Sequence, residues 1–221
     1  MSAPSMSFYC LGERAVVMQT STDKIDLIHQ KKLWHVAQQL RDLNLCIDIV
    51  PGMNNLTAIF DPLLHSSDDI LRTLKDLFQH SKDKFQGGRE IAIPVHYGGD
   101  SGPDLPFVAE HCQLSLEDVV KRHCAANYVV YFLGFQPGFA YLGGMPESLA
   151  TPRRAEPRSR VPAGSVGIGG KQTGIYPAAS PGGWQLIGHT TLKLFDPQRA
   201  EPTLLQPGDS VRFVVEHIQF S

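Results

Sequence analysis

The sequence is short of the residues and patterns that mark several common classes of protein. Its 221 residues include only four cysteines, which form no Cys-x-x-Cys pair, and its nine histidines show no His-x-His or His-x-x-x-His spacing. Neither a zinc site nor a disulfide framework is therefore predicted, and we expect no bound metal. Each cysteine lies in an apolar pattern typical of a small buried side chain. His111 and His123 fall in predicted helices, where we expect them to be partly exposed.

Excess charge and long apolar runs are also lacking. The 20 Lys and Arg residues nearly balance the 22 Asp and Glu residues, and no basic stretch follows a helix face, so nucleic acid is not an expected partner. No segment approaches the roughly 18 consecutive apolar residues of a membrane-spanning helix. Residues 1–7 lack the basic and apolar regions of an export signal. The sequence therefore predicts a soluble, cytoplasmic protein without a membrane partner.

The length and composition of the chain suit two compact domains. With 42% hydrophobic residues it can bury one large core or two small ones, and it is too short to carry a nucleotide-binding half of its own. The apolar pattern changes near residue 90. We therefore predict an α+β fold, with one domain over residues 1–90 and a second over residues 91–221.

The first 90 residues combine strand and helix patterns in the proportions of one small domain. The predicted elements, in chain order, are a strand or hairpin at 8–18, a helix at 23–43, strands at 46–50 and 56–60, a helix at 68–78 and a strand at 89–95. The order strand-helix-strand-strand-helix-strand is that of the split βαβ arrangement. We therefore predict a ferredoxin-like α+β domain over residues 1–90.

The second domain begins with short helices and continues as short β-prone runs. The predicted elements are a helix at 104–111, a helix beginning at 115, and strands at 127–135 and 210–215. Ser115 can cap the second helix, with Asp118 completing a capping box. Residues 131–190 hold 12 of the 20 glycines and seven of the 16 prolines, a distribution typical of strands joined by loops. We predict a closed or nearly closed β-barrel.

Aromatic residues alternate with glycine and proline between Gly134 and Gly144. A loop of this composition needs something for its rings to pack on, which is either its own barrel or a ligand or partner. We predict that Phe135, Pro137 and Gly138 shape a substrate pocket or contact another protein of a complex.

Four arginines lie within eight positions of a proline-rich segment that contains a single acidic residue, Glu156. Charge runs are often no more than a solvated surface. Here the prolines stiffen the segment and hold the guanidinium groups at fixed spacing, which favours bidentate binding of a carboxylate or phosphate. We predict that Arg153, Arg154 and Arg160 bind an anionic substrate and that Arg158 is catalytic.

The glycine-rich segment 163–174 resembles several ligand-binding motifs without matching them. A P-loop would need glycine at Ser165 and Ser or Thr at Gln172, and no helix follows that a dinucleotide fingerprint or a nucleophile elbow would require. The pattern instead predicts two strands joined by a turn, whose amides can approach a ligand. We predict catalytic roles for Gln172 and Tyr176 and substrate binding by Thr173.

A turn at 180–183 places Trp184 at the start of a predicted strand. Tryptophan in this position is commonly a core residue, but its large ring also suits the wall of a pocket. We include Trp184 among the predicted substrate-binding residues.

Several ordered blocks of sequence are together similar to the allophanate hydrolase subunit 1 family. They lie at 134–139, 151–154, 157–168, 172–177 and 180–184, and the loop at 97–105 fits as well. That family includes a component of 5-oxoprolinase and an inhibitor of a sporulation histidine kinase. This sequence departs from the pattern at His189, where arginine is expected. If this position helps to bind an anion, the charge that His189 offers to the anion changes with pH near 6.5.

The resemblance implies a cyclophilin-like barrel in the second domain and an activity shared between several proteins. The activity is the ATP-dependent hydrolysis of 5-oxoproline to glutamate. The implied partners are the C subunit, which is a homologous barrel protein, and the lactam-recognising A subunit. An unstrained lactam is a poor electrophile, and phosphorylation of its carbonyl oxygen creates a leaving group. Because this chain has no nucleotide-binding loop, ATP and Mg²⁺ are expected on a partner or at a shared interface, with no cofactor bound by this chain alone.

Other functions remain open at this level. Family membership also admits inhibition of a sensor histidine kinase through the barrel. A carboxyltransferase-like half-site, as in urea carboxylase, is a third hypothesis, in which biotin would sit on another chain because no Ala-Met-Lys-Met acceptor is present. A prolyl isomerase is the least favoured hypothesis, because a barrel fold does not by itself imply that function.

Overall fold

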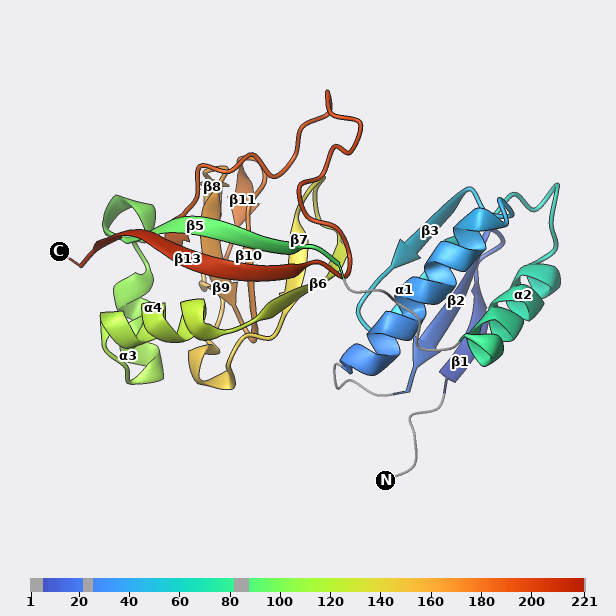
Figure 1. Ribbon diagram of the computed structural model, residues 1–221, viewed down its shortest axis with the longest axis horizontal. Coiled ribbons are helices and arrows are strands. Elements are labelled where there is room, and N and C mark those ends of the chain that lie inside the picture. Colours follow the sequence, from blue (N-terminus) through green and yellow to red (C-terminus); the bar gives the residue numbers. More distant parts are fainter. Residues whose placement is uncertain (1–5, 22–25, 82–87, 221) are drawn as a thin grey trace. The chain divides into compact units, whose positions relative to one another are not determined.

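The chain folds into two compact units, residues Met1–Gly87 and Gly88–Ser221, so the division falls at residue 87 where the sequence pattern placed it at residue 90. The computed structural model describes residues 6–21, 26–81 and 88–220 (Figure 1). The predicted start of the first helix at residue 23 lies outside these ranges.

The first unit is a four-stranded antiparallel sheet with two helices packed on it (Figure 1). Its elements are β1 (Met6–Leu11), β2 (Ala15–Thr20), α1 (Leu27–Asp42), β3 (Asp48–Pro51), β4 (Asn55–Ile59) and α2 (Ser67–His80). Side-chain oxygens cap both helices, since Asp26 accepts from the Ile28 amide and Ser66 from the Asp69 amide. Residues Met18, Leu33 and Leu56 meet in a core shared by sheet and helices.

The structure does not confirm the ferredoxin-like arrangement predicted for residues 1–90. The segment 8–18 is a hairpin of two strands, and the sheet order is β1-β2-β4-β3. The strand expected at 89–95 is β5 (Glu90–Gly98), which pairs with β12 and β13 in the second unit. An alternating pattern specifies a strand but not its sheet, so the element order alone assigned β5 to the wrong unit.

The second unit is built around a closed barrel of seven strands in the order β10-β7-β6-β13-β5-β12-β9. Besides β5, these are β6 (Tyr128–Leu133), β7 (Ala140–Gly143), β9 (Ser165–Gly169), β10 (Gln172–Ile175), β12 (Gln185–His189) and β13 (Ser210–Gln219). Strand β13 runs parallel to β5 and antiparallel to β6. The predicted barrel and the mixed α+β class are confirmed, and the cyclophilin-like type stays a prediction.

Smaller elements complete the second unit. They are the 3₁₀ turns η1 (Gly99–Ser101) and η2 (Glu147–Leu149), the helices α3 (Leu105–Cys112) and α4 (Leu116–Ala125), and a two-stranded sheet of β8 (Arg158–Val161) and β11 (Ser180–Gly182). Ser115 caps α4 as predicted, accepting a 3.0 Å hydrogen bond from the Asp118 amide. Helix α3 packs on β12 and α4 on β13.

A chain of polar groups crosses the barrel core, with His123 at its centre. Thr173 donates its single hydroxyl hydrogen to the Gly167 carbonyl (3.0 Å), so it must accept from His123 Nε2 (2.9 Å). His123 Nδ1 is then the acceptor for the Tyr97 hydroxyl at 2.8 Å. The prediction that His123 is partly exposed is wrong, because its ring is fully buried among Tyr97, Tyr128 and Phe213.

The cysteines are less buried than their apolar surroundings suggested. All four are free thiols, with Cys10 exposed and Cys46, Cys112 and Cys124 half-buried. Burial raises the thiol pKa of Cys46 and Cys124. In the described parts of the chain, no group of three or more His, Cys, Asp or Glu residues is placed to hold a metal ion. The helices described there are also too short or too polar to cross a membrane.

Gly98, the last residue of β5, lies opposite Gln219 of β13 and should be one of the least replaceable residues of the barrel. Its φ is +73°, and an added Cβ would overlap the Gln219 carbonyl oxygen. We expect Gly98→Ala to lower the free energy of unfolding of the barrel by about 3 kcal/mol or more. Gly170→Ala is the control, because Gly170 has a similar φ of +64° but open space around the Cβ position, and it should cost only about 1–2 kcal/mol. Equal losses in urea unfolding would contradict this account.

Candidate functional site

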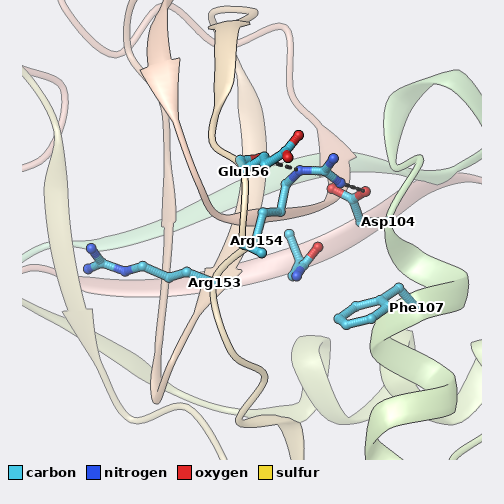
Figure 2. Close-up of a pocket in the computed structure, with 7 residues that line it drawn as sticks. Asp104, Phe107, Arg153, Arg154 and Glu156 are labelled. Atoms are coloured by element: carbon cyan, nitrogen blue, oxygen red, sulfur yellow. Dashed lines mark hydrogen bonds and ion pairs between the residues drawn. The ribbon is translucent and has the colours of Figure 1, made fainter.

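Two cavities of the barrel unit share one residue, Arg153, and together collect many of the predicted site residues. The larger, of about 530 Å³, is lined by Asp104, Phe107, Arg153, Arg154, Ala155, Glu156 and Gln185 (Figure 2). The smaller, of about 130 Å³, is lined by Phe135, Phe139, Tyr141, Arg153, Tyr176, Pro181, Gly182, Gly183 and Trp184. The proline-rich arginine segment therefore forms a wall of both.

A single buried carboxylate organises the larger cavity. Asp104 precedes helix α3, and its Oδ1 accepts from Arg158 Nη2 at 2.8 Å and from Arg154 Nη1 at 3.2 Å. Its Oδ2 accepts from the Leu186 amide of β12 at 2.7 Å. Two guanidinium groups thus converge on one carboxylate, which leaves a net positive charge on the cluster.

Arg158 keeps an unused donor in this cluster. Its Nη1 atom is buried and pairs with no atom of the described residues. An unpaired buried N–H group is costly, and a charged one more so. Arg158 lines neither of the two cavities, and a hydrogen bond from this donor to an oxyanion would remove that cost.

The segment that carries the arginines is fastened to the rest of the barrel unit by several hydrogen bonds, including a pair between Thr151 and Gly170. The Arg154 amide donates to the Gly183 carbonyl at 2.7 Å, and Gln185 Nε2 donates to the Pro152 carbonyl at 3.0 Å. Arg154 Nε also reaches the Glu156 carbonyl at 3.3 Å. Figure 2 shows Arg154 directed towards Asp104, whereas Arg153 points the opposite way.

Aromatic rings form the smaller cavity. Phe139, Tyr176 and Trp184 are buried and meet edge to face, with ring centroids 5.6 to 6.3 Å apart. The Arg153 guanidinium lies over the Trp184 ring, 6.0 Å from its centroid. The cavity therefore offers apolar walls and one cation, a combination suited to a small ring that carries a negative charge.

Phe135 stands at the rim of this cavity in an unfavourable backbone conformation. Its φ is +65° and its side chain is 62% exposed. Hydrogen bonds from the Gly134 amide to the Phe139 carbonyl and from Gln136 Nε2 to the Ala178 carbonyl hold the loop. Backbone strain of this kind is found preferentially at binding sites, so the loop presents Phe135 outward at an energetic cost.

Burial raises the pKa of the Tyr176 hydroxyl, while a hydrogen bond with the Trp184 backbone and the nearby charges of Arg153 and Arg158 act in the opposite direction. Tyr176 is therefore a neutral hydroxyl at physiological pH. It can donate a hydrogen bond to a ligand, and it is not poised to act as a base.

Arg158 and the other predicted site residues line neither of the two cavities. Thr173 is fully buried in the barrel and uses its hydroxyl in the His123 chain. Gln172 is at the far end of β10 from Tyr176, next to the turn, and Arg160 is exposed on β8. Gly138 has a φ of +82° and packs against Phe195, and Pro137 is exposed in the same loop.

Four residues of the larger cavity were not predicted from the sequence, namely Asp104, Phe107, Glu156 and Gln185. Asp104 did carry a signal, since it follows a glycine- and proline-rich loop and precedes a predicted helix. That position indicates a cap, but nothing in the sequence connects it with arginines 50 and 54 residues away.

His189, which stands where arginine was expected, does not line either cavity. Its Nε2 donates to the Ala163 carbonyl at 2.9 Å. The side chain therefore fixes the start of the β9 hairpin, and anion binding by His189 stays a prediction.

The chain belongs to a family of carboxyltransferase-domain proteins. Residues 6–205 match the family described as carboxyltransferase domain, subdomain C and D. The 5-oxoprolinase B subunit of Escherichia coli O157:H7 is 55% identical over 93% of this chain and 94% of that protein. That of Haemophilus influenzae is 48% identical over 97% of this chain and 100% of that protein.

The chain belongs to the family of 5-oxoprolinase B subunits, which confirms the relationship predicted from the ordered sequence blocks. Among solved structures, TTHA0988 matches 91% of this chain with a TM-score of 0.80 and 38% identity. This chain spans 40% of TTHA0988, which is the longer protein.

Proposed function

We propose that this chain is the B subunit of an ATP-dependent 5-oxoprolinase that hydrolyses 5-oxoproline to glutamate and works only with its A and C subunits. The observation that carries the proposal is the 55% identity to a 5-oxoprolinase B subunit over almost the whole of both chains. At such identity over full length, a shared role within the same kind of complex is the economical interpretation.

The smaller cavity suits the substrate of this reaction. 5-Oxoproline is a five-membered lactam with one carboxylate, so it needs apolar walls and one cation. Phe139 and Trp184 supply the walls, Arg153 supplies the cation, and Tyr176 supplies a hydroxyl donor. In this proposal Phe135 covers the mouth of the cavity or contacts the C subunit.

The two arginines paired with Asp104 suit the phosphoryl chemistry that activates a lactam. Charge on transferring phosphoryl oxygens is stabilised by positioned cations. Arg154 and the unpaired Nη1 of Arg158 are donors of that kind. The segment 163–174 forms the β9–β10 hairpin rather than a loop leading into a helix, and we therefore place ATP and Mg²⁺ on a partner or at a shared interface.

The proposal predicts that glutamate release from 5-oxoproline and ATP requires this chain. The measurement is reconstitution with candidate A and C subunits, leaving out each component in turn. Loss of activity when this chain is omitted is the expected result. Full activity without it would overturn the proposal, and slowing of a histidine kinase's autophosphorylation by the purified chain would then support the inhibitor function.

A further inference from the structure

We propose that Asp104 is the positioning residue of the arginine site: its carboxylate sets the direction in which Arg154 and Arg158 present their remaining N–H groups to an oxyanion. The inference concerns the same site as the proposed function, and it rests on that function for the identity of the oxyanion, a phosphoryl group or the substrate carboxylate.

Asp104 is held by the barrel independently of the arginines. Its amide donates to the Leu186 carbonyl at 2.9 Å, and its Oδ2 accepts from the Leu186 amide at 2.7 Å. The preceding loop lies against β12 so closely that a Cβ on Gly102 would overlap the Ile187 carbonyl oxygen. The position of the carboxylate is therefore fixed by β12 and the start of α3.

The guanidinium groups of Arg154 and Arg158, in contrast, have few hydrogen-bond partners among the described residues, although the backbone of their segment is fastened to the unit. Strand β8 pairs only with the three-residue strand β11 in the described structure. Arg154 precedes β8 in a segment without regular structure. Arg154 Nε donates to the Glu156 carbonyl within the same segment, so the two bonds to Asp104 Oδ1 are the side-chain bonds that orient the guanidinium groups relative to the barrel in the described structure.

The charges in the cluster are unequal, which distinguishes it from an ion pair that only stabilises the fold. Asp104 is 8% exposed and faces two guanidinium groups, each with five donors. After the two bonds to Asp104, Arg158 Nη1 remains buried and unpaired among the described residues, and the Arg154 side chain is 36% exposed at the cavity. A surplus cation with free donors is an arrangement for binding an anion.

Asp209 offers a matched comparison within the same barrel. It is similarly buried, at 4% exposure, and pairs with Arg89 Nη2 at 2.7 Å. It also accepts from the amides of Arg89 and Gln206. Its carboxylate fastens the start of β5 to the turn that leads into β13, and Asp209 lines neither of the two cavities. Asp209→Asn therefore weakens a buried ion pair without touching the site.

The experiment measures how well an oxyanion protects arginines from a dicarbonyl reagent. Purified full-length chain is treated with phenylglyoxal, and modification of Arg154 and Arg158 is followed by peptide mass mapping, with and without inorganic phosphate or 5-oxoproline. We expect protection in the native chain and in Asp209→Asn. In Asp104→Asn we expect the concentration of anion needed for protection to rise at least about tenfold. Asp104→Glu, which keeps the charge but moves the carboxylate by one methylene, should lose protection as well.

The outcomes separate this inference from the proposed function. Protection by phosphate only, or by 5-oxoproline only, supports the inference and identifies the oxyanion. Native protection in a folded Asp104 variant, an equal loss in Asp209→Asn, or no protection of the native chain by either anion would overturn it. The proposed function is tested separately by glutamate release from the reconstituted complex, which fails or succeeds independently of the protection assay.

Discussion

Arg158→Ala is expected to lower the kcat/KM of the reconstituted complex for 5-oxoproline about a hundredfold, the usual effect of removing one charge clamp from a transition state. Arg158 donates a hydrogen bond from Nη2 to Asp104 and keeps an unpaired donor at Nη1. Alanine removes both, while Arg154 still neutralises Asp104. The loss should therefore appear in activity far more than in the free energy of unfolding.

Two further variants sharpen the test of Arg158. Arg158→Lys keeps the charge but cannot hold Asp104 and an oxyanion with a planar fork, so it should recover little of the activity. Arg212→Ala removes an exposed arginine of β13 that faces Glu90 at 3.7 Å, and it should leave activity unchanged. Activity of Arg158→Ala within about twofold of the native complex would show that the clamp assignment is wrong.

The barrel should lose stability steeply in acid because His123 is buried as a neutral ring. Burial lowers its pKa from 6.5 to about 3. Above pH 6.5 the ring is unprotonated in both the folded and the unfolded chain, so its titration does not change the free energy of unfolding. As the pH falls from 6.5 towards 3, only the unfolded chain takes up the proton, and stability decreases. At about 1.4 kcal/mol per pKa unit, the full loss is about 5 kcal/mol.

The measurement is urea unfolding of the barrel between pH 4 and pH 8. Replacing Trp34 with phenylalanine leaves Trp184 as the single fluorescent tryptophan, so the signal reports the barrel unit. His123→Gln should flatten the dependence on pH, because glutamine has no proton to take up. His217→Asn removes an exposed histidine and should keep the native slope. A native slope in His123→Gln would exclude the buried ring as its cause.

Local patterns predicted the secondary structure well, and the failures concern long-range partners. The spacing of apolar residues indicated both helices of the first unit, and the Ser115 cap was visible in four residues of sequence. The sheet to which β5 belongs was not visible, because its partners in β12 and β13 lie about 90 and 120 residues further along. Register between such distant strands depends on the whole barrel.

For the site, too, the residue types were predicted and the long-range partners were not. The sequence predicted Arg153, Tyr176, Trp184 and Phe135, and the structure brings these four around one cavity. The sequence did not show that the side chains of Arg154 and Arg158 point towards Asp104. Prolines stiffen the backbone and fix the spacing of the arginines, but they do not fix the direction of the arginine side chains. Threonine is a residue type that often binds ligands. Only the structure shows that the Thr173 side chain points into the barrel, where its hydroxyl donates to the Gly167 carbonyl.

The parallel pairing of β13 with β5 also bears on how the chain is made. Glu90 lies opposite Ser210, so the barrel cannot close before residues 210–219 have left the ribosome. The strands of the first unit pair only with one another, all within residues 6–59 of the described structure. During synthesis the first unit can fold before the barrel has its last strand, and contacts so distant in sequence form slowly. Exposed barrel strands in this interval are the stage at which nascent chains are most open to aggregation and most in need of chaperones.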